Sequence, residues 1–513
     1  MVAISALSQT KGERPQLVVG IIIDQLRSDY IELLQNHFGQ NGFNRLLRDG
    51  VYFEDVNFDV ADLDKVSGTS IVMTGAYPSI SGVGGATIYD PQKKRSQYTL
   101  NDPSKLGNFT SETYSPAALK VSTIGDELRV SNDGLGYVYS IAPDPQQAII
   151  LAGHAGNCAF WINDLNGKWA TSTFYKEVPQ VISLRNYNNP LSSRIDTMAW
   201  NPVLPLKDYP DVPTYRKYYP FKYTFPNSLT RYSDYKKSAL VNNEVTSVAI
   251  LYIQGLKLGK REQTDMLNIA YTAAPYKVKD GDYSFELQDT YIRLDREIEK
   301  LLDAIDKNVG LRNAVVMISS TGYFDGGNKV DDKFNVPSGE FRPSRANSLL
   351  NLYLMAIYGN GQWVDGYNNQ NFYLNRKLIK EKNVNLREVR EKSSDFLRRM
   401  SGVATAYTLD EIISNPVDEE VKRLHRGLVL ETAGDVRIEV RPGWRVVENE
   451  NTTTEQVRYV RSNLVNTPAF ILAPDIKAQK IIIPVDATIL APTVSRILRI
   501  RSPNAAAQRP YIL

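Results

Sequence analysis

The stretch QLVVGIIIDQL, residues 16–26, decides the fold. Its apolar residues form a nearly continuous, mostly β-branched run, which is typical of a strand buried on both faces of a parallel sheet. The run ends at Asp24, where polar residues take over. Ligands of open parallel sheets bind beyond the carboxyl ends of the strands, so Asp24 is a candidate site residue from its position alone.

Helical and strand-like patterns alternate outward from this stretch. Residues 28–50 and 285–310 have helical apolar spacing, and the apolar runs at 246–256, 313–320 and 467–476 predict further strands. The alternation predicts an α/β protein with a doubly wound, mostly parallel sheet flanked by helices and carrying inserted cap elements. The predicted division is residues 1–14 as a signal-peptide remnant or disordered N-terminus, 15–150, 245–345 and 460–513 as the core, 150–245 as a Tyr/Pro-rich insertion, and 345–460 as a smaller α+β cap lobe.

Composition excludes several classes of protein. The 60 basic and 57 acidic residues leave a net charge of +3 without a long basic block, so no nucleic-acid partner is expected. No apolar run approaches the roughly 18 residues of a membrane span, so no transmembrane span is expected. The single cysteine, Cys158, excludes an intrachain disulfide, and its apolar neighbours predict core packing.

The N-terminal segment MVAISALSQTKGERPQ, residues 1–16, resembles the end of a secretory signal. Small residues precede polar sequence, whereas the charged head and most of the apolar core of such a signal are missing. The pattern predicts an exported protein, located in the periplasm or associated with the outer membrane. A frayed cytoplasmic N-terminus is the alternative.

Several motifs resemble those of the alkaline phosphatase superfamily, in particular its bacterial phosphate-monoesterase and nucleotide pyrophosphatase-phosphodiesterase branch, typical of Bacteroidota. They occur in the expected order over nearly the whole chain and include VVGIIIDQLRSDYI, MTGAYPSISGVGG, AGHAGNCAFWIND, LQDTYIRLDREIEKLLDAID, IEVRPGW and VDATILAPTVSRILRI. The resemblance implies a doubly wound sheet, hydrolysis of phosphoric esters, and two zinc ions that flank a Thr or Ser nucleophile.

The nucleophile position implied by the resemblance falls on Lys65, three residues before Gly68. An ammonium group cannot form the metal-bound alkoxide of that chemistry. The implied substrate-contact positions are changed too, because Ala86 stands for an Asn, and Asp144 and Gln146 stand for a Lys-x-Arg pair. An Asp in place of a Lys turns attraction of a phosphate dianion into repulsion.

Only one of the six metal-ligand positions implied by the resemblance, Asp24, carries a zinc ligand. The five changed positions are Pro275, Lys279, Thr321, Gly322 and Asn466. Catalytic zinc takes three protein ligands from His, Cys and carboxylates. The three histidines, His37, His154 and His425, lie at none of these positions and are expected to be structural or solvated. The sequence therefore predicts no metal cofactor, with the two zinc ions of the family lost.

Lys65 suggests a replacement for the lost metal charge. Without the metal ions, Asp24 would lack a positive counter-charge at the end of a buried strand, which is strongly unfavourable. We therefore expect Lys65, together with Lys279, to pair with Asp24; a solvated Lys65 on a relaxed loop is the alternative. A further open alternative is a calcium-like ion held by the acidic loop residues Asp59, Asp62 and Asp64.

These changes predict a catalytically inactive member of the superfamily that acts as a scaffold or binding module in the cell envelope. The alternative is a metal-dependent phosphoric- or sulfuric-ester hydrolase with a rebuilt site. A protein partner in the cell envelope is expected, with a glycan as the second candidate, because the insertion is rich in tyrosines of the kind found at interfaces. The candidate interface residues are Tyr215, Tyr218, Tyr219, Tyr223 and Tyr232, and a cap packed on its own core is the alternative.

Overall fold

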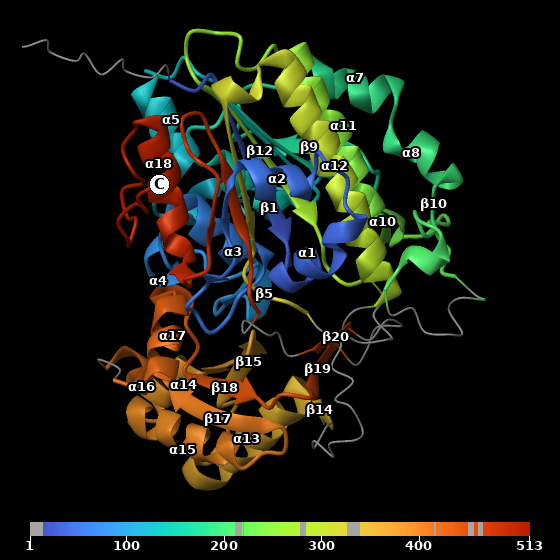
Figure 1. Ribbon diagram of the computed structural model, residues 1–513. Coiled ribbons are helices and arrows are strands. Elements are labelled where there is room, and N and C mark those ends of the chain that lie inside the picture. Colours follow the sequence, from blue (N-terminus) through green and yellow to red (C-terminus); the bar gives the residue numbers. More distant parts are fainter. Residues whose placement is uncertain are drawn as a thin grey trace, which may run out of the picture.

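A large core and a smaller lobe make up the protein, with the smaller lobe, in orange, below the core in Figure 1. The computed structural model describes residues 14–210, 218, 220–276, 284–325, 339–414, 417–449, 456–459 and 465–513. Within these ranges, no helix is both long enough and apolar enough to cross a membrane.

A ten-stranded sheet forms the centre of the core in the described residues. Its strands lie in the order β22 (Gln479–Ile481), β2 (Val51–Phe53), β21 (Ala469–Leu472), β13 (Ala314–Ser320), β1 (Leu17–Asp24), β12 (Asp265–Thr272), β7 (Val138–Ala142), β8 (Cys158–Ile162), β9 (Trp169–Ser172) and β6 (Gly107–Asn108). The strands from β13 to β8 run parallel, whereas β21 and β9 pair antiparallel with their neighbours. The predicted α/β fold with a mostly parallel sheet is confirmed.

Strand β1 lies between β13 and β12, and all eight of its residues are buried. This explains its continuous apolar sequence, since both of its faces are covered. Gly20 is needed for close packing in this strand, because a Cβ atom there would lie 2.3 Å from the Asn268 Oδ1 atom of β12. The strand therefore delivers Asp24 to the carboxyl edge of the sheet.

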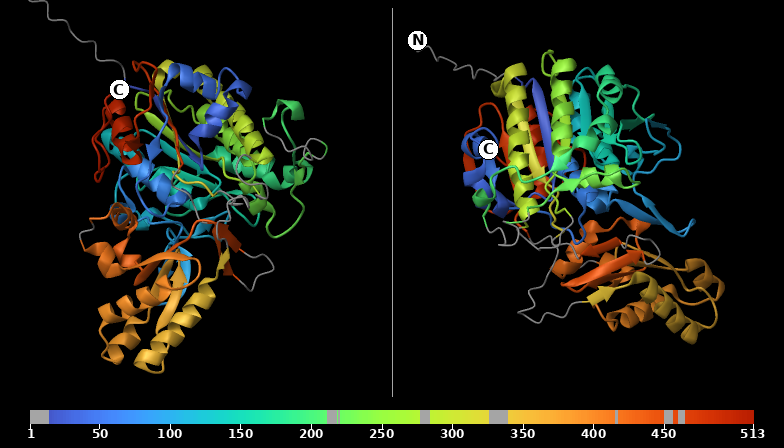
Figure 2. Two further views of the ribbon diagram at one scale, coloured as in Figure 1. Left: turned by 60° about the horizontal axis from the view of Figure 1, so that its bottom comes forward. Right: turned by 90° about the vertical axis from the view of Figure 1, so that its right-hand side faces the viewer.

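Helices cover both faces of the sheet. One group contains α1 (Ser28–Leu34), α2 (Phe43–Asp49), α11 (Leu240–Gly255) and α12 (Phe285–Asn308), and the other contains α3 (Lys65–Thr74), α5 (Ile124–Ser131), α6 (Pro145–Ala152) and α18 (Leu490–Leu498). Figure 2 shows α11 and α12 side by side on one face. This two-sided arrangement is the predicted doubly wound architecture.

Two sequence-based assignments in this region are wrong. Residues 246–256, predicted as a strand, form most of α11, because periodicity alone does not distinguish a short apolar run in a buried helix from one in a strand. The predicted insertion at 150–245 begins too early, since β8 and β9 belong to the main sheet. The elements that follow are α7 (Gln180–Asn188), α8 (Leu191–Arg194), β10 (Ala199–Trp200), β11 (Tyr223–Thr224) and α10 (Arg231–Lys237).

The smaller lobe has its own hydrophobic core, formed by residues between Phe341 and Val446. Its four-stranded sheet has the order β15 (Val364–Asn368), β16 (Asn371–Leu374), β18 (Val436–Val440) and β17 (Val403–Thr408). The surrounding helices are α13 (Pro343–Tyr358), α14 (Arg376–Glu381), α15 (Leu386–Arg398), α16 (Leu409–Ile413) and α17 (Glu419–Gly427). A second sheet consists of β14 (Gly339–Phe341), β19 (Trp444–Asn449) and β20 (Gln456–Tyr459).

A hairpin of the core, β4 (Thr87–Asp90) and β5 (Arg95–Tyr98), contacts the smaller lobe through Tyr89, whose ring stacks on that of Tyr373 at 4.2 Å. This hairpin links the two bodies outside the main sheet. The short elements used below are α4 (Pro78–Ser81), β3 (Val56–Asn57), β23 (Val485–Asp486), η1 (Gln35–His37) and η7 (Leu430–Thr432), of which β3 pairs with β23.

Candidate functional site

The carboxyl edge of the sheet brings together most of the positions singled out in the sequence. Strand β1 ends there, β12 and β13 run parallel to it, and the antiparallel β21 begins there. The candidate metal positions at this edge are therefore Asp24, Pro275, Thr321, Gly322 and Asn466. These positions form one region, as the α/β topology predicts.

Asp24 is almost fully buried, with 8% of its surface exposed. The Thr321 hydroxyl donates a hydrogen bond of 2.9 Å to its Oδ1 atom. Burial raises the pKa of Asp24 from 3.8 to about 6, and the positive charge of Lys65 opposes part of this rise. The carboxyl group therefore changes its protonation state close to neutral pH, which is useful in proton transfer.

Gln25, directly after Asp24, has a φ of 61°, a conformation that is unfavourable for a residue with a side chain. Two contacts hold it there: its N–H donates to the Thr321 hydroxyl at 3.0 Å, and its Oε1 accepts from the Asp325 N–H at 2.8 Å. Backbone strain of this kind is often found at functional sites. Gln25 could not be predicted as a site residue, because no residue pattern in the sequence marks its backbone angle.

Lys65 is the first residue of α3, which begins with an N-cap and a capping box at Asp64. The helix packs closely on the end of β13, since a Cβ atom on Gly68 would lie 2.2 Å from the Thr321 carbonyl oxygen. The side chain of Lys65 is 37% exposed. Its position on a capped helix excludes the relaxed-loop alternative.

The ion pair of Lys65 corrects the predicted pairing with Asp24. Its Nζ atom lies 2.8 Å from Asp144 Oδ2, and its charge acts on Asp24 only at longer range. Burial alone would raise the pKa of Asp144, but the charges of Lys65 and Lys236 and the hydrogen bonds to the carboxylate together outweigh burial, so the pKa lies below its usual value. Lys279, the other predicted partner of Asp24, lies outside the described residues.

Lys65 and Asp144, which both depart from the residues implied by the resemblance, therefore compensate each other's charge. Asp144 also caps α6, where its Oδ1 atom accepts from the Gln146 N–H at 2.9 Å. The Gln146 side chain is buried and donates to the Ala86 carbonyl at 3.0 Å, while the Ala86 N–H donates to Asp64 at 2.6 Å. The three predicted substrate-contact positions are thus joined in one network around the start of α3 and α6.

The acidic loop does not form the alternative calcium site. Asp59 pairs with Arg426, and Asp62 pairs with Arg437 at 2.6 Å. Asp64 is occupied by the first backbone N–H groups of α3. Throughout the described part of the chain, no group of three or more His, Cys, Asp or Glu residues is placed to hold a metal ion.

The described residues near Asp24 do not fit a pair of zinc ions either. The Thr321 hydroxyl is bonded to Asp24, Gly322 has no side chain, and Asn466 is exposed. The histidines are elsewhere: His37 lies on η1 and His425 on α17. His154 contacts Asp126 at 3.4 Å and the Leu119 carbonyl at 2.8 Å.

The candidate interface tyrosines divide into packed and exposed residues. Tyr232 is buried, and the Tyr223 hydroxyl donates to Glu286 at 2.8 Å beside the ring of Trp200. Tyr232 is therefore packed inside the protein, as in the packed-cap alternative, whereas Tyr223 is partly buried with its hydroxyl bonded to Glu286. Tyr218 is 76% exposed, whereas Tyr215 and Tyr219 lie outside the described residues.

Comparisons with known proteins cover nearly the whole chain. A sequence model described as type I phosphodiesterase / nucleotide pyrophosphatase matches residues 18–463. Alkaline phosphatase PafA of Elizabethkingia meningoseptica is 28% identical over 97% of this chain and 94% of its own. A calcium-transporting ATPase of Myroides odoratus is 27% identical over 99% and 96%, and alkaline phosphatase PhoV of Synechococcus elongatus 27% over 96% and 92%.

The crystal structure of wild-type PafA has the same fold. It superimposes with a TM-score of 0.83 at 27% identity, over 97% of this chain and 98% of PafA. The predicted resemblance to the alkaline phosphatase superfamily is confirmed by this match and by the sequence comparisons.

The same relatives correct two predictions. The prediction of a catalytically inactive scaffold is contradicted, because proteins similar along almost their whole length are named alkaline phosphatases. The prediction of no metal cofactor is contradicted by the same relatives, because it rested on the inference that the phosphatase chemistry of the family is lost in this chain. Both predictions assumed that phosphoric-ester hydrolysis is lost once the residues at the nucleophile and metal-ligand positions of the family have changed.

Proposed function

Because the chain belongs to the type I phosphodiesterase / nucleotide pyrophosphatase family of the alkaline phosphatase superfamily, we propose that it is a phosphoric-ester hydrolase with a rebuilt site. The observation that carries this proposal is the similarity to named alkaline phosphatases along almost the whole of both chains. The rebuilt site lies at the carboxyl edge of the sheet, where Asp24, Lys65 and Asp144 meet.

The side chains at this edge have complementary roles in the proposal. Lys65 supplies a positive charge on a partly exposed ammonium group, which attracts a phosphoryl oxygen of the ester. Asp24 has a pKa of about 6 and takes the proton from an attacking water molecule. The water oxygen forms a bond to phosphorus while the phosphorus–oxygen bond to the alcohol breaks, and the leaving alcohol oxygen takes a proton from bulk water. Asp144 orients Lys65 through their ion pair.

Turnover by the purified full-length chain tests the proposal. We expect release of p-nitrophenol from p-nitrophenyl phosphate or from bis(p-nitrophenyl) phosphate, above the rate in buffer. The same assay after chelation, and after addition of zinc, measures whether the activity requires a metal ion. No release from either ester under any of these conditions would refute the proposal, and release from p-nitrophenyl sulfate alone would assign a sulfuric-ester hydrolase instead.

Asp144→Asn is expected to strengthen inhibition by inorganic phosphate by about fivefold or more. The change removes a negative charge beside Lys65, and unit charges about 4 Å apart interact by about 1–4 kcal/mol. Asn still caps α6, so the helix should be retained. The measurement is the inhibition constant of phosphate in the ester assay.

Asp418→Asn is the matched control for this change, because Asp418 caps α17 in the smaller lobe. It should leave phosphate inhibition as it is in the unchanged protein. Weaker inhibition in Asp144→Asn would show that the Lys65–Asp144 pair does not face the substrate anion.

Export to the periplasm and a protein partner in the cell envelope complete the proposal. Export is supported by the signal-like residues 1–14, of which 1–13 lie outside the described residues. A partner is supported by the exposed ring of Tyr218 in the insertion. Cell fractionation tests export, and a purely cytoplasmic protein would contradict it. Photo-crosslinking from position 218 tests the protein partner, and the absence of any crosslinked product would contradict it.

A further inference from the structure

A cavity of about 580 Å³ lies between the smaller lobe and the core hairpin, apart from the residues of the sheet edge. Its walls come from four segments of the chain: the β4–β5 hairpin, the start of β15, the turn from β16 into α14, and the region from η7 to Asp435. Small-molecule sites usually have volumes of about 300–1,000 Å³, so this cavity has the size of a ligand site. The proposed hydrolysis uses none of its lining residues.

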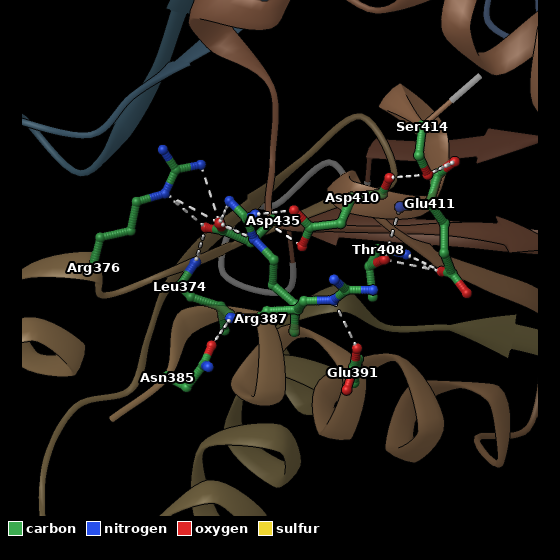
Figure 3. A network of polar contacts seen from close by, with 11 residues as sticks. Leu374, Arg376, Asn385, Arg387, Glu391, Thr408, Asp410, Glu411, Ser414 and Asp435 are labelled. Carbon is green, nitrogen blue, oxygen red and sulfur yellow. Dashed lines mark hydrogen bonds and ion pairs between the residues drawn. The ribbon is translucent and has the colours of Figure 1, made fainter. Parts of the chain in front are cut away.

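Three residues of the cavity lining, Leu374, Arg376 and Asp435, belong to the polar network drawn in Figure 3. Buried Asp435 accepts from the Leu374 N–H at 2.9 Å and pairs with Arg390 at 2.8 Å and with Arg376 at 3.0 Å. Figure 3 shows Arg376 and Asp435 joined at one end of the network. The ion pair with Asp435 holds the guanidinium group of Arg376 in place. Because the Arg376 side chain is 53% exposed, the group still has hydrogen-bond donors available at the cavity.

The charges around the cavity cancel in pairs. Each pair places a cation beside an acid, and the pairs are Lys94–Asp365 at 2.7 Å, Arg376–Asp435 at 3.0 Å, Lys377–Glu381 at 4.0 Å and Lys120–Glu431 at 2.5 Å. Because every charged side chain at the cavity already has an opposite charge beside it, the cavity offers no excess of one charge that would attract an ion. The charge pattern therefore favours a neutral ligand.

The polar groups of the wall suit a ligand with many hydroxyl groups. Hydroxyls donate to carboxylates and accept from a guanidinium group at the same time, and the side-chain amides of Gln362 and Asn375 add both kinds of partner. The side chain of Leu378 provides an apolar surface for carbon–hydrogen groups, together with the small exposed parts of Tyr89 and Tyr373, whose buried rings stack on each other. We propose that this cavity binds a neutral carbohydrate.

Calorimetric titration of the full-length protein tests this site. The probes are maltose, cellobiose and N,N′-diacetylchitobiose, with inorganic phosphate as the charged comparison. We expect at least one disaccharide to bind in the millimolar range and phosphate not to displace it. Arg376→Ala should weaken that binding by about tenfold, equivalent to about 1.4 kcal/mol.

Two further variants separate binding from folding. Arg387→Ala is the matched control, since Arg387 is an exposed arginine of the same lobe that pairs with Glu391 and does not line the cavity; it should bind the disaccharide unchanged. Ala433→Phe fills the cavity without changing its charge and should abolish binding. Binding of none of the disaccharides, displacement by phosphate, or unchanged binding by Arg376→Ala and Ala433→Phe would overturn the proposal.

Discussion

Asp24→Asn is expected to lower ester hydrolysis by about a hundredfold or more and, at the same time, to make the protein more stable at pH 8. Asn keeps the shape of the side chain and its hydrogen bond from Thr321, but it cannot take a proton from water. Removal of a general base typically costs about 10²–10⁴ in rate. The loss of rate follows from the loss of the titrating group.

The gain in stability follows from the raised pKa of Asp24. The pKa is about 6 in the folded protein and 3.8 for the ordinary group, so the folded state binds more protons between these values. Stability therefore falls as the pH rises from about 4 to 6, and the full penalty is present above pH 6. A difference of about two pKa units corresponds to roughly 3 kcal/mol, which the neutral Asn avoids.

Denaturant unfolding of both proteins at pH 4 and pH 8 measures this effect. The stabilisation by Asp24→Asn should be large at pH 8 and absent at pH 4. Asp295→Asn is the contrasting variant: burial also raises the pKa of Asp295 to about 6, but its oxygens accept from the N–H groups of Gly39 and Phe43. Since an amide has only one acceptor oxygen, this variant should gain less or lose stability. An Asp24→Asn protein that is less stable than the unchanged protein at pH 8 would contradict the account of a carboxylate whose negative charge is made unfavourable by burial.

Asp435→Ala is expected to destabilise the protein by about 3–5 kcal/mol. The change leaves the buried Arg390 with Asp410 as its remaining acid and leaves the Leu374 N–H without its acceptor. Breaking a buried ion pair by removing one partner usually has an effect of this size, because the remaining buried charge loses compensation; here Arg390 loses the more buried of its two acids. The midpoint of unfolding in urea measures the loss.

Arg376→Ala provides the comparison for this change. Its side chain is half exposed, and Asp435 keeps Arg390 and the Leu374 N–H as partners, so a loss of at most about 1 kcal/mol is expected. Equal effects of Asp435→Ala and Arg376→Ala would show that the network of Figure 3 does not support the smaller lobe.

The fold could be predicted from sequence because its central elements have strong local patterns. The β-branched run of β1 and the amphipathic spacing of α12 both appear where they were expected. Helix α11 could not be recognised in the same way, since its second half is apolar over many consecutive positions and is buried against the sheet and α12. Because α11 is buried on several sides, its sequence does not alternate between apolar and polar residues with the period of a helix.

The site could be predicted only in part. The sequence places Asp24 at the end of β1, and it also shows the missing hydroxyl at Lys65 and the reversed charge at Asp144. Their ion pair depends on how α3 packs through Gly68 against the end of β13, which no local pattern encodes. The prediction of an inactive protein was wrong for a related reason, because it considered each changed position separately and not the ion pair that the changed residues form.

The most direct test of the central claim is the rate of p-nitrophenol release by the full-length chain and by Asp24→Asn, purified in parallel and assayed with the same phosphoric esters at pH 7. The account predicts measurable release by the unchanged chain and about a hundredfold less by the variant. Equal rates in the two preparations, or no release by the unchanged chain, would contradict it.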